Sequence, residues 1–298
     1  MPELPEVEVV RAGLAPAVTG ARVEAVDVLD ERALTRHPGL PSGFADELVG
    51  REIVAPVRRG KFLWMPLAGG DARALVGHLG MSGQLLLRAP GAPAERHERV
   101  RLFLLHPHHG ELAVVFADQR TFGSLAIDAL VPTADRAPGG HGADLAATPL
   151  MVAHIARDPL DPAFDENAFR RALARKESAV KRVLLDQTVV SGVGNIYADE
   201  SLWAARVHPE TPVRMLSARA VTRLLGELRA VLQKALAEGG TSFDAQYVNV
   251  NGQAGYFAHS LEAYGRGGAP CSRCGRPIQR VSFMNRSSHF CPRCQRLP

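Results

Sequence analysis

The chain has 298 residues, 46% of them hydrophobic, which is enough for two or three compact units with buried cores. No run of eighteen apolar residues occurs, and the opening Met-Pro-Glu-Leu-Pro-Glu lacks the regions of a signal peptide, so we expect a folded cytoplasmic protein without a membrane span. The formal net charge is only +4, which excludes a strongly basic or acidic chain as a whole.

The first half of the chain predicts one helix followed by short strands. Val7, Val10, Leu14 and Val18 recur at helical spacing and indicate an amphipathic helix. Gly and Pro then separate most of a series of β-rich runs, at residues 23–28, 51–58, 61–67, 73–79, 83–88, 98–105, 111–117 and 122–127. This pattern favours an antiparallel sandwich over a parallel α/β sheet, and we assign it to residues 1–130.

Helical patterning begins after a stretch rich in Pro, Gly, Ala and Asp at residues 131–150, which is typical of a linker. Short apolar stripes occur around Phe169 and Val183. A longer stripe runs from Val221 to Ala235 and ends before Gly239-Gly240, as a helix C-terminus should. We expect a helical unit over residues 151–240, and thus an α+β protein.

The C-terminal tail combines basic charge with all four cysteines. Residues 263–298 contain seven arginines and no Asp or Glu, which suits a nucleic acid, although a merely solubilising tail is an alternative. Cys271, Cys274, Cys291 and Cys294 have the spacing of a four-thiolate zinc site, with two disulfides as the competing interpretation. We favour one structural Zn²⁺, because so short and polar a segment buries too little apolar surface to fold unaided.

The N-terminus itself carries a candidate nucleophile. Removal of Met1 would leave Pro2 with a free secondary amine, whose unperturbed pKa of roughly 7.7 to 8.0 leaves part of it unprotonated near neutrality. Such an amine can attack a sugar C1′, and Glu3 and Glu6 are candidate acid and base groups. The alternative is that Pro2 and the glutamates only start a helix.

Several motifs resemble those of the formamidopyrimidine-DNA glycosylase family, and they run along the whole chain. They are residues 1–8 (Met-Pro-Glu-Leu-Pro-Glu-Val-Glu), 58–61 (Arg-Arg-Gly-Lys), 78–83 (His-Leu-Gly-Met-Ser-Gly), 118–123 (Asp-Gln-Arg-Thr-Phe-Gly) and 192–197 (Gly-Val-Gly-Asn-Ile-Tyr). The resemblance implies an N-terminal β-sandwich flanked by helices, a helix-two-turn-helix domain, a lesion-recognition loop and connector at 241–262, and a zinc finger at 263–298.

The resemblance also implies catalytic roles. Pro2 would attack C1′ of the damaged nucleotide, and Glu3 would supply or shuttle the proton that releases the base. Lys61 would assist β-elimination and Arg286 δ-elimination, which leaves a one-nucleotide gap with phosphate at both ends. For these two residues a plain phosphate contact is an alternative.

Further positions match residues that contact DNA in this family. His78, His97, Lys176 and Asn195 would touch phosphates. Met81, Arg120 and Phe122 would fill the gap left by the extruded base, with Arg120 facing the orphaned partner, although isolated Met and Phe residues are more often core. In the segment 241–249, Ser242, Tyr247 and Val248 would belong to a loop that closes over the lesion.

The implied partner is double-stranded DNA that contains oxidised bases or abasic sites, bound by a monomer. Leu4 and the segment 241–249 favour oxidised purines, while oxidised pyrimidines or non-catalytic binding of damaged DNA are alternatives. Two departures from the family pattern, Thr121 and Glu98-Arg99, leave phosphate contacts and opposite-base preference open. Two other interpretations fail, because Tyr197 replaces the last glycine of a dinucleotide fingerprint and no Gly-x-Ser-x-Gly elbow occurs.

Overall fold

The computed structural model describes residues 2–241, 250 and 255–298, and it divides into two compact units. Unit 1 comprises Met1–Pro2, Glu6–His154 and Thr241–Gly255, and unit 2 comprises Glu3–Pro5, Ile155–Gly240 and Tyr256–Pro298. No described helix is both long and apolar enough to cross a bilayer.

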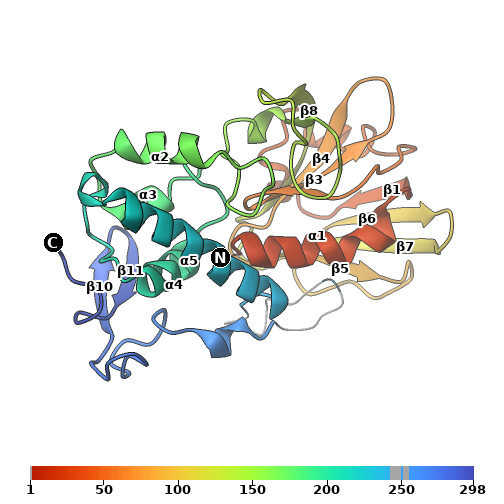
Figure 1. Ribbon diagram of the computed structural model, residues 1–298. Coiled ribbons are helices and arrows are strands. Elements are labelled where there is room, and N and C mark those ends of the chain that lie inside the picture. Colours follow the sequence, from red (N-terminus) through yellow and green to blue (C-terminus); the bar gives the residue numbers. More distant parts are fainter. Residues whose placement is uncertain (1, 242–249, 251–254) are drawn as a thin grey trace. The chain divides into compact units, whose positions relative to one another are not determined.

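Unit 1 is a sandwich of two antiparallel sheets that share one hydrophobic core (Figure 1). The first sheet has the order β1-β6-β7-β5, formed by Arg22–Val28, Glu98–His106, Gly110–Asp118 and Gly83–Arg88. The second has the order β2-β3-β4-β8-β9, formed by Val57–Arg59, Phe62–Leu67, Arg73–His78, Ser124–Pro132 and Ala147–Pro149. The predicted sandwich is confirmed.

The structure corrects two stretches of the expected pattern. Most of 51–58 forms only isolated bridges, and strand β2 starts at Val57 because Pro56 cannot donate a ladder hydrogen bond. The stretch 131–150, whose composition indicated a linker, instead supplies the end of β8 and strand β9 to the second sheet.

The predicted N-terminal helix is α1, Leu4–Val18. Val7, Val10, Leu14 and Val18 are each at most 2% exposed and pack into the sandwich core. The period of the apolar residues therefore identified both the helix and its buried face.

Unit 2 contains the helices α2 (Glu166–Ala174), α3 (Val180–Leu184), α4 (Asn195–Ala205) and α5 (Ala218–Ala237), with a C-terminal hairpin of β10 (Gln279–Phe283) and β11 (Arg286–Phe290). The predicted apolar stripes form one core, which includes Phe169, Val183 and Leu228. Helix α5 ends before Gly239 and Gly240, both at positive φ, as the sequence predicts. The α+β class is confirmed.

Candidate active site

The Glu3 carboxylate lies at the N-terminus of α4. It accepts hydrogen bonds from the N–H groups of Gly194 (2.5 Å), Ile196 (2.9 Å) and Tyr197 (3.4 Å). A helix N-terminus stabilises an anion, so these donors favour the ionised carboxylate. Glu3 therefore occupies the N–H groups at the start of α4.

Two glycines make room for the N-terminal residues. A Cβ on Gly194 would lie 2.3 Å from the Glu3 carboxyl carbon, and one on Gly192 would lie 2.7 Å from the Cβ of Leu4. Leu4 donates its N–H to the Gly192 carbonyl (2.9 Å) and is fully buried. Residues 192–194 therefore form a socket for Glu3 and Leu4, and Pro2, which is buried, directly precedes them.

Glu6 is bonded to the start of the expected lesion loop. One of its carboxylate oxygens accepts both the N–H and the hydroxyl of Thr241, each at 2.8 Å, and both residues are buried. Ser242, Tyr247 and Val248 lie outside the described residues. Glu6 therefore holds Thr241, the first residue of the expected lesion loop.

Lys61 and His78 are brought together by the second sheet of unit 1. Lys61 lies in the turn between β2 and β3, and the next residue, Phe62, pairs with His78 on β4. Burial, and then the positive charges of Arg36 and Lys61, lowers the pKa of His78 to about 4. Its Nδ1 accepts the N–H of Gly80 (3.2 Å), so the neutral ring carries its proton on Nε2. At neutral pH His78 can give a phosphate a hydrogen bond but no charge.

The three residues expected to fill the gap in the duplex are on the surface. Met81 is 44% exposed and Phe122 is 53% exposed, while the Arg120 guanidinium carbon lies 4.8 Å from the centre of the Phe122 ring. This exposure excludes the alternative that they are core residues. Two loops, residues 79–82 and 119–123, carry them, and we call these the wedge loops.

His97 lies near the wedge loops, beside a cavity of 260 Å³ that Ser82 and Gln119 also line. The two residues that follow His97 are engaged within unit 1. Glu98 is buried and pairs with Arg101 (2.7 Å), and its pKa is lowered by that hydrogen bond. Arg99 pairs with Asp30 (2.8 Å). This departure from the family pattern therefore serves internal structure.

Lys176, Asn195 and Arg286 line two neighbouring hollows of unit 2. Lys176, which pairs with Asp186 (3.0 Å), lines a cavity of 590 Å³ together with Arg286. Arg286 also lines a second cavity, of 360 Å³, together with Asn195 and Arg280. Arg286 thus connects the two basic hollows.

Sequence reasoning missed a buried ion pair behind these hollows. Lys181 is fully buried, with its Nζ 2.6 Å from an oxygen of Asp199 and 3.1 Å from the Ser287 carbonyl. The other Asp199 oxygen accepts the N–H of His289 (2.8 Å), and Asn195 donates to the same Ser287 carbonyl (2.9 Å). These bonds fix β11, which begins at Arg286, against α4. In the sequence, Lys181 lies among the apolar residues of a helical stripe. Nothing in that pattern predicted that it would pair with Asp199.

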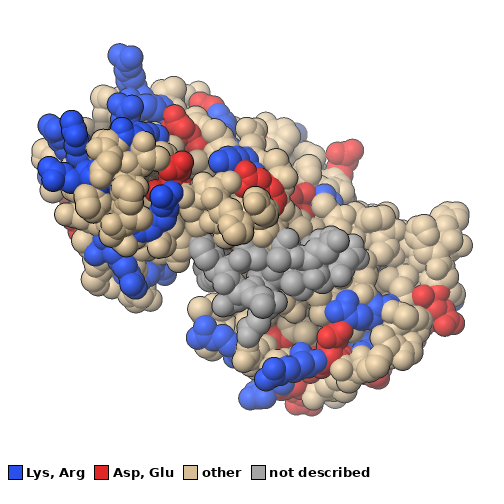
Figure 2. Space-filling view, turned by 90° about the horizontal axis from the view of Figure 1, so that it is seen from below, with Lys and Arg blue, Asp and Glu red and all other residues tan. Residues whose placement is uncertain are grey.

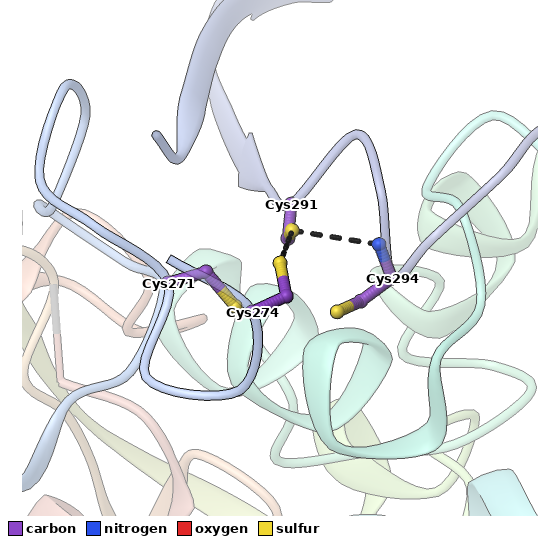
Figure 3. Close-up of side chains that lie close together, drawn as sticks. All are labelled: Cys271, Cys274, Cys291 and Cys294. Atoms are coloured by element: carbon purple, nitrogen blue, oxygen red, sulfur yellow. Dashed lines mark hydrogen bonds between the residues drawn. The ribbon is translucent and has the colours of Figure 1, made fainter. Parts of the chain in front are cut away.

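The four cysteines converge, as Figure 3 shows. All four Sγ atoms lie within 4.8 Å of one another, and each cysteine is a free thiol, so the disulfide alternative is excluded. Four thiolates at Zn–S distances of about 2.3 Å lie roughly 3.8 Å apart at the corners of a tetrahedron, which fits this cluster. The finger holds one structural zinc whose coordination by four sulfurs leaves no open position for chemistry.

The finger is also attached to α4 by aromatic and polar contacts. The Arg273 guanidinium stacks 3.6 Å from the centre of the Trp203 ring and donates to the Trp203 carbonyl (2.6 Å). Figure 2 shows Lys and Arg side chains gathered at the end of the molecule where Figure 1 places β10 and β11. The predicted basic tail is therefore a folded, positively charged surface of unit 2.

Comparison with known proteins covers nearly the whole chain. Residues 1–125 match the formamidopyrimidine-DNA glycosylase N-terminal domain, 155–246 its H2TH (helix-two-turn-helix) domain, and 268–297 the zinc finger found in FPG and IleRS. Formamidopyrimidine-DNA glycosylases of Leifsonia xyli and Nocardioides sp. are 64% and 58% identical, over all of this chain and 100% and 95% of their own lengths.

Comparison with solved structures identifies the same family. The Lactococcus lactis Fpg in complex with DNA that contains an abasic site is 31% identical, with a TM-score of 0.80 over 99% of both chains. A mutant of that enzyme bound to Fapy-dG DNA gives a TM-score of 0.82 at the same identity, over 99% of this chain and 100% of its own. The chain described here belongs to the formamidopyrimidine-DNA glycosylase family of DNA repair enzymes.

Proposed function

We propose that this protein excises oxidised purines, such as 8-oxoguanine and formamidopyrimidines, from duplex DNA and then cleaves the abasic site by β,δ-elimination. The observation that carries the proposal is the Glu3 carboxylate, which directly follows Pro2 in the sequence and is fixed at the start of α4 by backbone N–H groups. The Lactococcus lactis relative has been solved with Fapy-dG DNA and with abasic-site DNA.

The chemistry starts at the Pro2 amine. Its nitrogen forms a bond to C1′ while the bond between C1′ and the base breaks, and the base leaves with the electron pair and takes up a proton. Opening of the sugar then gives an iminium ion, which acidifies the C2′ proton. Loss of that proton expels the 3′-phosphate, and a second elimination expels the 5′-phosphate, which leaves a one-nucleotide gap.

The remaining residues have supporting roles. Glu3 supplies or shuttles the proton that releases the base. Lys61 acts in the first elimination and Arg286 in the second, while His78, His97, Lys176 and Asn195 bind phosphates. Met81, Arg120 and Phe122 occupy the gap in the duplex, since excision requires the base to leave the stack.

A borohydride trapping experiment tests the nucleophile. Wild-type protein with Met1 removed, as verified by mass spectrometry, should become covalently attached to lesion-containing DNA, and Pro2→Gly should be trapped far less. Trapping of Asp46→Asn, a change at a carboxylate outside the site, should match the wild type. Wild-type protein that binds damaged DNA but is never trapped would instead be a non-catalytic binding protein.

Oxidised pyrimidines are a second candidate substrate class, because the Lactococcus lactis Fpg has also been solved with DNA that contains an oxidised pyrimidine. Single-turnover rates on duplexes with 8-oxoguanine, formamidopyrimidine or thymine glycol separate the two classes. Faster release of thymine glycol than of both purine lesions would overturn the purine assignment.

A further inference from the structure

The wedge loops touch each other through their backbones. A Cβ on Gly80 would lie 2.5 Å from the carbonyl carbon of Phe122 and from the nitrogen of Gly123, and Gly80 has a φ of 61°. Only a residue without a side chain fits this approach. The position of one loop therefore determines the position of the other.

A single buried carboxylate joins the two loops. Asp118, at the end of β7, is 1% exposed. Its Oδ1 accepts the Ser82 hydroxyl (2.5 Å) from the first loop and the Arg120 N–H (3.1 Å) from the second. Its Oδ2 accepts the Gly123 N–H (2.7 Å). Each loop is thus bonded to Asp118 directly beside the residues with exposed tips.

The backbone of Asp118 extends the same connection to two other residues. Its N–H donates to the His97 carbonyl (2.9 Å), and its carbonyl accepts the Arg99 Nε (2.9 Å). Arg99 is in turn paired with Asp30 (2.8 Å). Arg99, which departs from the family pattern, therefore anchors the wedge loops to the sandwich.

We propose that Asp118 is a positioning residue that holds Met81, Arg120 and Phe122 as one preformed unit for insertion into the duplex. This inference rests on the proposed function. Asp118 itself is buried and touches no DNA. Its bonds order both loops before binding, so that the protein does not lose this conformational freedom when the base leaves the stack.

Asp118→Asn is the direct test, because an amide of the same shape offers one acceptor in place of two and turns a donor toward one loop. We expect base excision from duplex DNA to fall by about 10- to 100-fold, as for a small misplacement of a positioned group. Cleavage of a preformed abasic site in single-stranded DNA has no gap to fill and should stay within about twofold. Ser82→Ala removes the hydroxyl that donates to Asp118 (2.5 Å) and accepts the Arg120 N–H (3.2 Å), but it leaves the Asp118 bonds to Arg120 and Gly123. It should show a smaller loss with the same substrate dependence.

Asp128→Asn is the matched control. Asp128 is also a buried carboxylate of unit 1, and it accepts the Met151 N–H (2.7 Å) away from the wedge loops. Unchanged duplex excision by both Asp118→Asn and Ser82→Ala, or an equal loss on both substrates, would overturn the positioning role. A wild-type protein that neither excises nor is trapped would overturn the proposed function instead.

Discussion

Thr241 donates two hydrogen bonds to the same oxygen of Glu6, one from its N–H and one from its hydroxyl, each 2.8 Å long. Thr241→Val keeps the shape of the side chain and removes the hydroxyl bond. Because a buried bond to a charged group contributes about 1.5 to 3 kcal/mol, we expect a loss of that order in the free energy of unfolding, measured with urea.

The same variant should separate two activities if Glu6 fixes the start of the lesion loop. Excision of a base should fall several-fold, while cleavage of a preformed abasic site, which has no base to hold, should not change. Thr222→Val, which alters an exposed hydroxyl on α5, is the control. Equal loss of both activities would point to a role for Glu6 outside the loop.

His78 should stay neutral throughout the physiological range, because its pKa is lowered to about 4 by burial and by Arg36 and Lys61. In the unfolded chain the ring has a pKa of about 6.5, so the unfolded state takes up a proton first as the pH falls. The stability that the neutral ring contributes is complete above pH 6.5 and is lost as the pH falls toward 4.

Two measurements check this prediction. The NMR signals of the His78 ring should show no titration between pH 8 and about 5.5. The difference in the free energy of unfolding between the wild type and His78→Gln should shrink between pH 7.5 and pH 5. A midpoint near the ordinary histidine pKa of about 6.5 would contradict the lowered pKa.

Lys181→Met should be strongly destabilising because it leaves the Asp199 carboxylate buried without its cation. Removal of one partner of a buried pair costs about 3 to 5 kcal/mol. Burial lowers the pKa of Lys181, and the Asp199 charge opposes that shift. The double variant Lys181→Met/Asp199→Leu should recover much of the loss in urea unfolding, whereas Lys234→Met, at a lysine that is 56% exposed, should change little. Equal losses in the single and double variants would show that the charge itself is not responsible.

Zinc removal should unfold the finger and leave the sandwich intact. With chelator or in Cys291→Ser, DNA affinity should fall, and the plot of log affinity against log salt should become less steep by roughly 0.9 for each lost arginine contact with a phosphate. Circular dichroism should keep the strand signal of unit 1. If neither the DNA affinity nor the circular dichroism spectrum changed when zinc was removed, the assignment of a structural zinc site would be wrong.

Local sequence pattern predicted the elements of this fold, because the spacing of residues such as Val7, Val10 and Leu14 is set by the faces that they bury. The cysteine spacing likewise predicted the zinc cluster. The start of strand β2 was predicted too early, at residue 51, because apolar residues before Pro56 match a strand pattern. The proline interrupts that pattern, and the strand begins at Val57.

Contacts between distant segments could not be predicted in this way. Glu3 binds N–H groups that follow it by more than 190 residues, and only the fold brings them together. In the sequence, the departures at Glu98 and Arg99 suggested altered contacts with DNA. In the structure Glu98 pairs with Arg101, and Arg99 binds Asp30 and the Asp118 carbonyl. A charged residue does not reveal in sequence whether it faces solvent or the interior.

The space beside Gly194 has a consequence for the tolerance of the chain to mutation. A single methyl group at this position would lie 2.3 Å from the Glu3 carboxyl carbon and push the acid away from the helix. In a saturation library, position 194 should therefore be as intolerant as a residue that takes part in the chemistry, although it contributes only an N–H group and an empty volume.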